Sequence, residues 1–153
     1  MTPAIILLEQ KHINFTVLSY EHDATATQFG LEAVEKLKLN AEQVFKTLLL
    51  ETSNNKLVVA ITPVSQQVNL KQLAKACGVK KVAMAEPNKV AASTGYILGG
   101  VSPLGQKKRL DTYIHQRAEK FNTIYVSAGK RGLEIALCPL DLKTLTQATF
   151  ACF

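Results

Sequence analysis

Residues 99–105 (GGVSPLG) form the most unusual segment of the sequence, because three glycines and one proline lie within seven positions. Such a run indicates a backbone held in a special shape, with positive φ at one glycine or more. Rigidly held backbone N–H groups stabilise the negatively charged oxygen of a tetrahedral intermediate, and glycine lets a ligand approach closely. The segment therefore predicts a site that stabilises an oxyanion.

Two better-known glycine motifs do not fit this segment. A phosphate-binding loop needs a lysine directly after its last glycine, but Gln106 follows Gly105 and no serine or threonine comes next. A nucleophile elbow needs a glycine two positions after its serine, and Leu104 occupies that place after Ser102. The sequence supports neither nucleotide hydrolysis nor a serine nucleophile.

Lys46 interrupts a predicted strand at residues 44–50 (VFKTLLL), where alternation places it on the same face as Val44 and Leu48. A buried lysine is costly unless it is paired or reaches a wet pocket. An edge-strand lysine that blocks aggregation would give the same pattern, so both interpretations remain open. The next residue, Thr47, should point to the opposite face.

A second basic element lies at residues 129–132 (GKRG). The spacing resembles the G-x-x-G clamp of KH domains, but that clamp joins two helices, whereas both flanks here are predicted strands. We therefore expect a hairpin turn. This turn places Lys130 and Arg131 at a loop tip, where a phosphate could meet them.

Charge is spread unevenly along the chain, whose net charge is +6. Residues 1–60 carry five Lys/Arg and seven Asp/Glu, whereas residues 61–153 carry thirteen and five. This split predicts a basic face that meets a polyanion such as nucleic acid. A basic surface that serves only solubility is the alternative.

Length and composition indicate one globular domain over residues 1–153, with 47% hydrophobic and 20% charged residues. No apolar run reaches the roughly 18 residues of a membrane helix. The first residues lack the basic region and cleavage site of a signal peptide, so we expect no membrane association and a cytoplasmic location. The three cysteines and three histidines form no disulfide or zinc motif, so we expect no metal.

The elements that must position these residues follow from periodicity and from capping residues. Thr2 and Pro3 begin the first helix, and Asn69 and Gly78 bound a later one. Helices are expected at residues 3–11, 31–37, 70–77, 86–95 and 139–145, and strands at 14–20, 44–50, 57–62, 81–85, 123–127, 133–137 and 150–153. Their order predicts a mixed α/β (α+β) domain with one mixed sheet surrounded by helices.

Three stretches together resemble the YbaK family: residues 44–48 (VFKTL), 99–105 (GGVSPLG) and 125–134 (YVSAGKRGLE). The resemblance covers essentially the whole chain in the same order. That family comprises free-standing bacterial Cys-tRNA deacylases and is similar to the editing domain inserted into bacterial prolyl-tRNA synthetases. It implies a single mixed α/β domain with a central, barrel-like sheet.

The resemblance implies a trans-editing hydrolase that cleaves the 3′ aminoacyl ester of Cys-tRNA(Pro) and Cys-tRNA(Cys). Prolyl-tRNA synthetase mischarges its tRNA with cysteine because the two amino acids are close in size, so a second site must hydrolyse the error. The implied partners are aminoacyl-tRNA and prolyl-tRNA synthetase, without a cofactor. The family's nucleophile is the thiol of the substrate cysteine, so Cys77, Cys138 and Cys152 should be dispensable.

Residue roles also follow from the resemblance. Lys46 matches the family's functional lysine, which would orient the substrate or support the ester electrostatically. The other candidates are the catalytic loop residues Gly99, Gly100, Val101 and Ser102; the substrate-binding residues Tyr20, Phe29, Thr47, Pro103, Gly105, Ser127, Ala128 and Gly129; and the tRNA phosphate contacts Lys107, Lys108, Arg109, Lys130 and Arg131.

Two alternatives remain open. The first is the same fold acting on another small aminoacyl-tRNA, such as Ala-tRNA(Pro). The second is a non-catalytic module that binds tRNA or a synthetase, which would show salt-dependent tRNA binding without hydrolysis.

Overall fold

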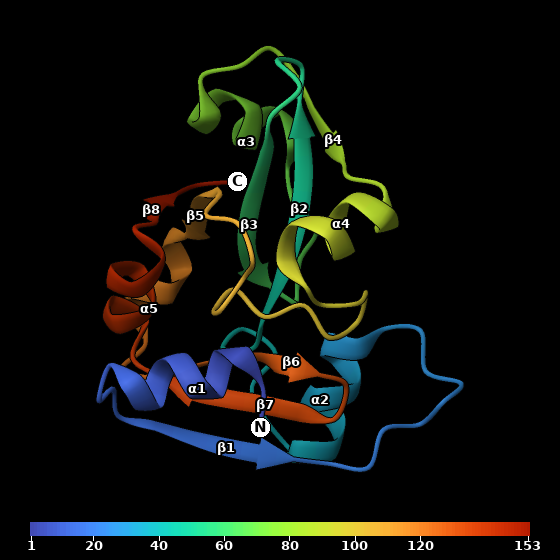
Figure 1. Ribbon diagram of the computed structural model, residues 1–153, viewed down its shortest axis with the longest axis vertical. Helices are drawn as coiled ribbons and strands as arrows, with labels where there is room; N and C mark the ends of the chain where they lie inside the picture. Colours follow the sequence, from blue (N-terminus) through green and yellow to red (C-terminus); the bar gives the residue numbers. More distant parts are fainter.

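The computed structural model describes residues 1–153 as two β-sheets with helices around them (Figure 1). The elements in chain order are α1 (Pro3–Gln10), β1 (Phe15–Ser19), α2 (Phe29–Leu37), β2 (Phe45–Thr52), β3 (Leu57–Pro63), α3 (Leu70–Cys77), β4 (Val82–Met84), α4 (Pro87–Thr94), β5 (Asp111–His115), the 3-10 helix η1 (Gln116–Lys120), β6 (Ile124–Lys130), β7 (Leu133–Leu137), α5 (Pro139–Thr146) and β8 (Thr149–Ala151).

The strands form two sheets instead of the single barrel-like sheet expected from the sequence. One is antiparallel with the order β1-β7-β6, and the other is mixed with the order β4-β2-β3-β5-β8. Only an isolated bridge between Val44 and Tyr125 connects them. Because β4 and β8 remain free edges, no closed barrel forms, and the α+β class is confirmed while the barrel is not.

Strand β5 was missed by the sequence analysis, although it lies inside the larger sheet. It pairs in parallel with β3 on one side and with β8 on the other. Its five residues, DTYIH, begin two positions after the exposed run Lys107–Arg109, which has the pattern of a loop. Its strand conformation comes from its two neighbours more than from its own pattern.

The predicted helix signals are confirmed. The Thr2 side chain accepts a hydrogen bond from the backbone N–H of Ile5, at 3.3 Å, and Pro3 begins α1. The Asn69 side chain accepts from the N–H of Gln72, at 3.0 Å, and caps α3. These contacts satisfy backbone donors that the first helical turn leaves unpaired.

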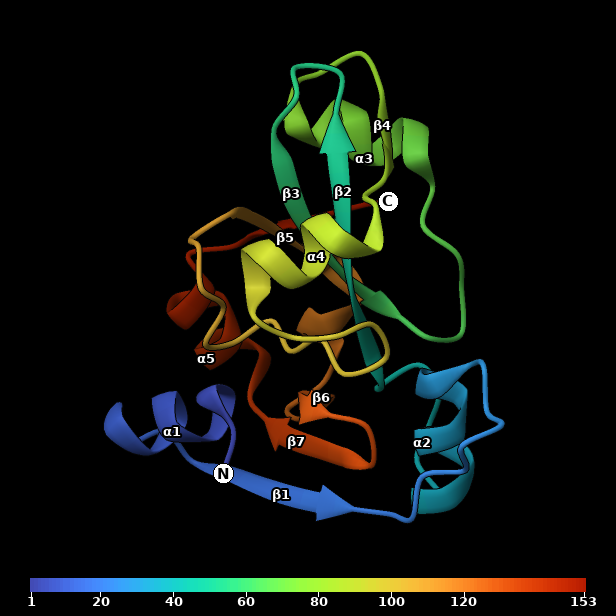
Figure 2. The same ribbon diagram turned by 45° about the vertical axis from the view of Figure 1, so that its right-hand side comes forward.

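The main hydrophobic core lies between the two sheets and the helices packed on them. It contains 20 buried residues, contributed by α1, by both sheets and by the 99–105 segment. A smaller cluster of seven buried residues packs the larger sheet against α3. Figure 2 shows α4 lying across β2 and β3, with the chain from residue 95 onward passing below it. None of the helices combines the length and the hydropathy needed to cross a bilayer.

The second half of the 99–105 segment is fixed by hydrogen bonds that it makes with its neighbours. The Tyr96 hydroxyl donates to the Leu104 carbonyl at 2.6 Å, and the Ser102 hydroxyl accepts from the Leu104 N–H at 3.3 Å. The Gln106 side-chain amide donates to the Ser102 carbonyl at 3.0 Å. These contacts tie residues 102–106 to their neighbours.

Gly105 shows why this segment needs glycine, because its φ is +70° and an added Cβ would lie 2.7 Å from the Pro3 carbonyl carbon. Gly78 has nearly the same φ, +72°, but an added Cβ there would meet nothing within 4 Å. The two positions thus share a conformational cost and differ only in the space available.

We predict that Gly105→Ala destabilises the protein more than Gly78→Ala does. The left-handed conformation alone costs about 1–2 kcal/mol in either variant. Overpacking against α1 should add about 1–3 kcal/mol at Gly105. Urea denaturation of both variants measures the difference, and equal free energies of unfolding would contradict the packing of this segment against α1.

Candidate active site

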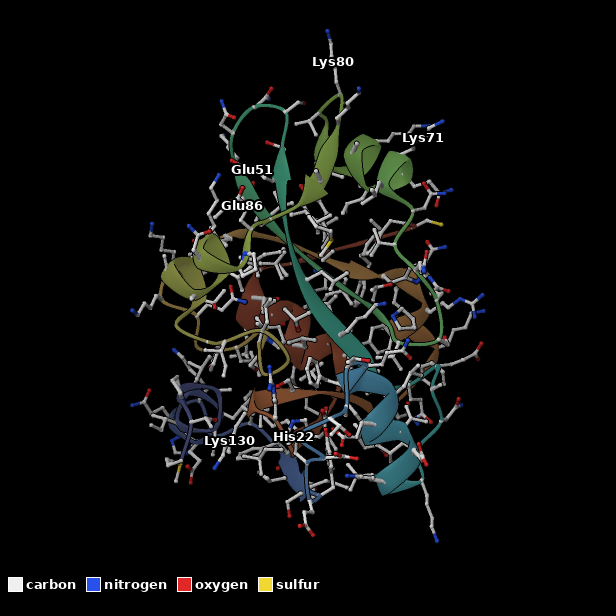
Figure 3. All side chains as sticks on the ribbon, turned by 90° about the vertical axis from the view of Figure 1, so that its right-hand side faces the viewer. His22, Glu51, Lys71, Lys80, Glu86 and Lys130 are labelled. Carbon is white, nitrogen blue, oxygen red and sulfur yellow. The ribbon has the colours of Figure 1, made fainter.

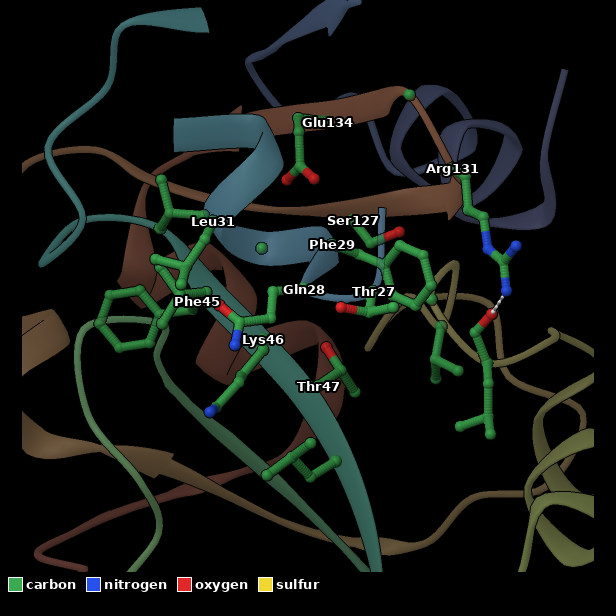
Figure 4. A pocket seen from close by; sticks show the side chains of 18 of the residues that line it. Thr27, Gln28, Phe29, Leu31, Phe45, Lys46, Thr47, Ser127, Arg131 and Glu134 are labelled. Atoms are coloured by element: carbon green, nitrogen blue, oxygen red, sulfur yellow. Dashed lines mark hydrogen bonds between the residues drawn. The ribbon is translucent and has the colours of Figure 1, made fainter. Parts of the chain in front are cut away.

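A cavity of about 610 Å³ lies where the two sheets meet (Figure 4). Its walls come from five separate parts of the chain and from Tyr20. They are residues 27–31 at the start of α2, 44–48 at the start of β2, 64–67 after β3, 98–101 without Gly100, and residues 127, 130–132 and 134 of the β6–β7 hairpin.

Lys46 lines this cavity and forms no ion pair or hydrogen bond through its ammonium group. Burial lowers the pKa of Lys46. Of the two sequence interpretations, the structure therefore shows a lysine in a pocket. It lies on a part of β2 that pairs with β3, before the pairing of β2 with β4 begins at Leu50. An unpaired cation in such a site attracts an electron-rich group from a ligand.

Thr47 also lines the cavity, and it points away from Lys46, as strand alternation predicted. Its hydroxyl is buried and has no hydrogen-bond partner in the protein. A buried polar atom without a partner is costly and is commonly satisfied by a ligand or by water. Figure 4 shows the Lys46 and Thr47 side chains leaving opposite sides of β2.

Glu134 is the main functional candidate that the sequence analysis missed. It lines the cavity from β7, is only 7% exposed, and its Oε2 atom has no hydrogen-bond partner. Burial raises its pKa to about 8. Tyr20 lies in the same wall, and burial followed by the charge of Glu134 raises its pKa to about 12, so its hydroxyl remains a donor.

Phe29 and Arg131 form one side of the cavity together with Gly99. The Arg131 guanidinium carbon lies 4.4 Å from the centre of the Phe29 ring, and its Nη2 donates to the Leu98 carbonyl at 2.8 Å. An added Cβ at Gly99 would lie 2.6 Å from both Phe29 and Arg131. Glycine at position 99 therefore lets the Phe29 and Arg131 side chains pack against the backbone here.

The loop before Phe29 is tied to helix α2 by Glu32. The Glu32 carboxylate lies 2.7 Å from Nδ1 of His22 and accepts from the N–H of Asp23 at 2.8 Å. It also accepts from the Lys36 ammonium at 3.0 Å. This cluster holds the chain where residues 27–31 can line the cavity.

The predicted oxyanion donors are not equivalent in the structure. The Gly100 N–H already donates to the Ile97 carbonyl at 2.9 Å. The N–H groups of Gly99 and Val101 donate to no protein atom, and both residues line the cavity. The amides of these two lining residues are therefore unpaired, whereas that of Gly100 is not.

Several other predicted site residues lie outside the cavity. Ser102 is fully buried, and its hydroxyl accepts the hydrogen bond described above. The Ala128 carbonyl accepts from the Thr2 hydroxyl, and an added Cβ at Gly129 would collide with Tyr96. None of these positions lines the cavity, and neither do Pro103 and Gly105. Ser127 does line it, and its hydroxyl accepts from the Gly129 N–H at 3.1 Å.

The predicted phosphate contacts divide into two groups. Lys130 and Arg131 are exposed and lie at the cavity wall. Lys107, Lys108 and Arg109 are exposed but do not line the cavity. The three free cysteines do not line it either, and no group of three or more His, Cys, Asp or Glu side chains is placed to hold a metal ion.

Residues 22–145 match the family model of the aminoacyl-tRNA editing domain. The chain belongs to this family. Across 151 residues it is 40% identical to EbsC of Enterococcus faecalis, which is provisionally named a Cys-tRNA(Pro)/Cys-tRNA(Cys) deacylase; the match covers 98% of this chain and 91% of EbsC.

The chain is also similar to a second deacylase and to a solved structure. The Ser/Thr-tRNA deacylase ProXp-y of Escherichia coli is 28% identical over 148 residues, covering 94% of this chain and 86% of that protein. A crystal structure provisionally described as a trans-editing enzyme for prolyl tRNA synthetase aligns with a TM-score of 0.82 over 99% of this chain and 96% of that one. Its 21% identity shows the shared fold only.

We predict that Glu134 makes stability fall as pH rises. Its pKa in the folded state is about 8, above the ordinary value of 4.5, so its contribution is fully present below pH 4.5 and is lost as pH approaches 8. Glu134→Gln keeps the shape without the ionisation, so its free energy of unfolding should fall less between pH 5 and pH 9. Urea titrations check this, with the exposed Glu35→Gln as control. Parallel pH profiles for wild type and Glu134→Gln would contradict it.

Proposed function

We propose that this protein is a trans-editing hydrolase that deacylates Cys-tRNA(Pro) and Cys-tRNA(Cys) by cleaving the 3′ aminoacyl ester. The proposal is carried by the cavity of this editing domain, in which an unpaired lysine and an unpaired buried glutamate face the same space. The 40% identity to EbsC supports cysteine as the amino acid. Prolyl-tRNA synthetase is proposed as the partner, because it produces the mischarged tRNA that must be cleared.

The two charged groups match the two ends of an aminoacyl ester. Glu134 has no positively charged partner in the protein, and the substrate's α-ammonium group supplies one. Direct pairing with this group favours the ionised form of the carboxylate. The ester carbonyl or the adjoining ribose supplies the electron-rich group for Lys46. Binding therefore relieves two unfavourable burials at once, which favours a ligand with an ammonium group and a hydrogen-bond acceptor over a purely apolar one.

Stabilisation of the transition state is assigned to Lys46 with the Gly99 and Val101 amides. Attack on the ester carbon places negative charge on the carbonyl oxygen. A cation and free N–H donors in a partly desolvated cavity stabilise that charge strongly, because they need little reorganisation. The stiffness of the 99–105 segment keeps these donors in place between turnovers.

The nucleophile is assigned to the substrate thiol. No histidine or cysteine lines the cavity, so its hydroxyl groups have no imidazole base to activate them. In the proposed step the cysteine sulfur forms a bond to its own carbonyl carbon. The bond from that carbon to the ribose oxygen breaks, and the ribose oxygen takes up the thiol proton. Water then opens the four-membered thiolactone to free cysteine.

We predict that Lys46→Ala abolishes deacylation without unfolding the protein. Loss of this electrostatic group should lower kcat/KM on Cys-tRNA(Pro) by about 100-fold or more, as loss of one oxyanion donor does. Release of cysteine from charged tRNA measures the rate, and circular dichroism confirms the fold. The exposed Lys143→Ala variant should keep wild-type activity. Full activity of Lys46→Ala would remove this residue from the mechanism.

A panel of aminoacyl-tRNAs tests the choice of substrate and nucleophile. Ser-tRNA carries oxygen where cysteine carries sulfur, so the thiol route predicts much slower release of serine. The similarity to a Ser/Thr-tRNA deacylase makes serine and threonine the relevant competitors, and Ala-tRNA(Pro) lacks any side-chain nucleophile. Equal rates for cysteine and serine would show that water attacks instead. Salt-dependent tRNA binding without hydrolysis of any of them would indicate a non-catalytic module.

A further inference from the structure

The chain from Thr52 to Ala85 contains five lysines and no aspartate or glutamate. All five lysines are exposed. We call them the lysine tip, and they are Lys56, Lys71, Lys75, Lys80 and Lys81.

The fold brings the lysine tip to one end of the molecule. The turn between β2 and β3 is held against the chain after α3, because the Ser53 N–H donates to the Lys81 carbonyl at 2.9 Å and the Lys81 N–H donates to the Ser53 hydroxyl at 3.3 Å. Lys75 lies in the last turn of α3. Figure 3 shows Lys71 and Lys80 projecting from this end of the molecule. Helix α2, which begins at the cavity wall, faces the viewer in the same picture.

No member of the lysine tip takes part in an ion pair. The four ion pairs of the structure involve His22, Lys36, Lys89 and Arg117 as the basic partners. Glu51, which precedes this acid-free stretch, is engaged by Lys89 at 2.7 Å. No ion pair therefore neutralises the positive charge of the tip, although the exposed Glu86 directly follows the stretch. Such a surface attracts a polyanion most strongly at low salt.

We propose that the lysine tip binds the phosphate backbone of the duplex stem of the tRNA whose 3′ end enters the cavity, an inference that rests on the proposed function. Strand β2 connects the two places, because it runs from Lys46 in the cavity to Thr52 beside the tip. Six residues of strand span about 20 Å at ~3.3 Å per residue. The 3′ end of tRNA is single-stranded for a few nucleotides. The distance from the terminal ester to the start of the duplex is therefore comparable to the distance from Lys46 to the tip.

Other basic surfaces fit the duplex less well. A second, more open hollow contains Arg117 and Lys120, but Glu119 also lines it and Arg117 is paired with Glu42 at 3.1 Å. Lys130 and Arg131 lie at the cavity itself, where the terminal nucleotide must sit. The five exposed lysines of the tip outnumber the cations of either of these surfaces, and none of them forms an ion pair.

The test compares two triple variants that remove the same charge. One is Lys71→Gln/Lys75→Gln/Lys80→Gln, and the control is Lys11→Gln/Lys38→Gln/Lys143→Gln, all at exposed positions without ion pairs. Each is assayed on full-length Cys-tRNA(Pro) and on cysteine esterified to the trinucleotide CCA. Binding of uncharged tRNA is measured by filter retention at several salt concentrations.

The tip variant should lose about tenfold or more in kcat/KM on the full-length substrate, and its log–log salt slope for tRNA binding should fall by about two, since each phosphate contact contributes ~0.7–0.9. Its activity on the trinucleotide ester should stay at the wild-type level, and the control should match wild type throughout. Unchanged tRNA kinetics and binding would overturn the proposal and leave an acidic protein surface as the occupant. Equal loss on both substrates would also overturn it. A wild-type protein that hydrolyses neither substrate would defeat the proposed function, while the tRNA binding of the variants would still decide the role of the tip.

Discussion

Lys46 and Glu134 share one cavity, and neither has a partner of opposite charge there. Removing a charge from water costs several kcal/mol, so the empty protein responds by shifting both groups toward neutrality. Burial raises the pKa of Glu134 to about 8 and lowers that of Lys46. The free energy gained by burying the hydrophobic core between the sheets offsets this cost. A ligand that carries an ammonium group and an ester oxygen restores both charges, so the electrostatic state of the empty cavity already favours an aminoacyl ester.

The cavity exists because the two sheets touch without merging. Beyond the bridge between Val44 and Tyr125, the start of β2 is not paired with the smaller sheet, and its residues 45–48 remain open to a ligand. A closed barrel would have filled this gap with strand pairing or side chains. The same strand then continues to the β2–β3 turn. It therefore ties the position of Lys46 to that of the exposed turn that carries Lys56.

The sequence predicted those features that depend on local chemistry. The caps of α1 and α3, the two hairpins and the unusual position of Lys46 each have a local signal. Glu134 has none, because in LEIAL it alternates with Leu133 and Ile135 and reads as a solvent-facing residue. In the structure, the face that carries it is covered by the cavity walls, which come from distant parts of the chain. Strand β5 escaped prediction for the same reason, since its partners β3 and β8 are distant in sequence.

The 99–105 segment shows how one sequence motif can serve two physical purposes. Its first part faces the cavity, and Gly99 is required there because Phe29 and Arg131 leave no room for a Cβ. Its last residue, Gly105, packs against the start of α1, and there glycine serves the core. Composition alone cannot separate these roles, because both demand a positive φ and a missing side chain. The packing of Gly105 on α1 holds one end of the segment, and the wall at Gly99 holds the other.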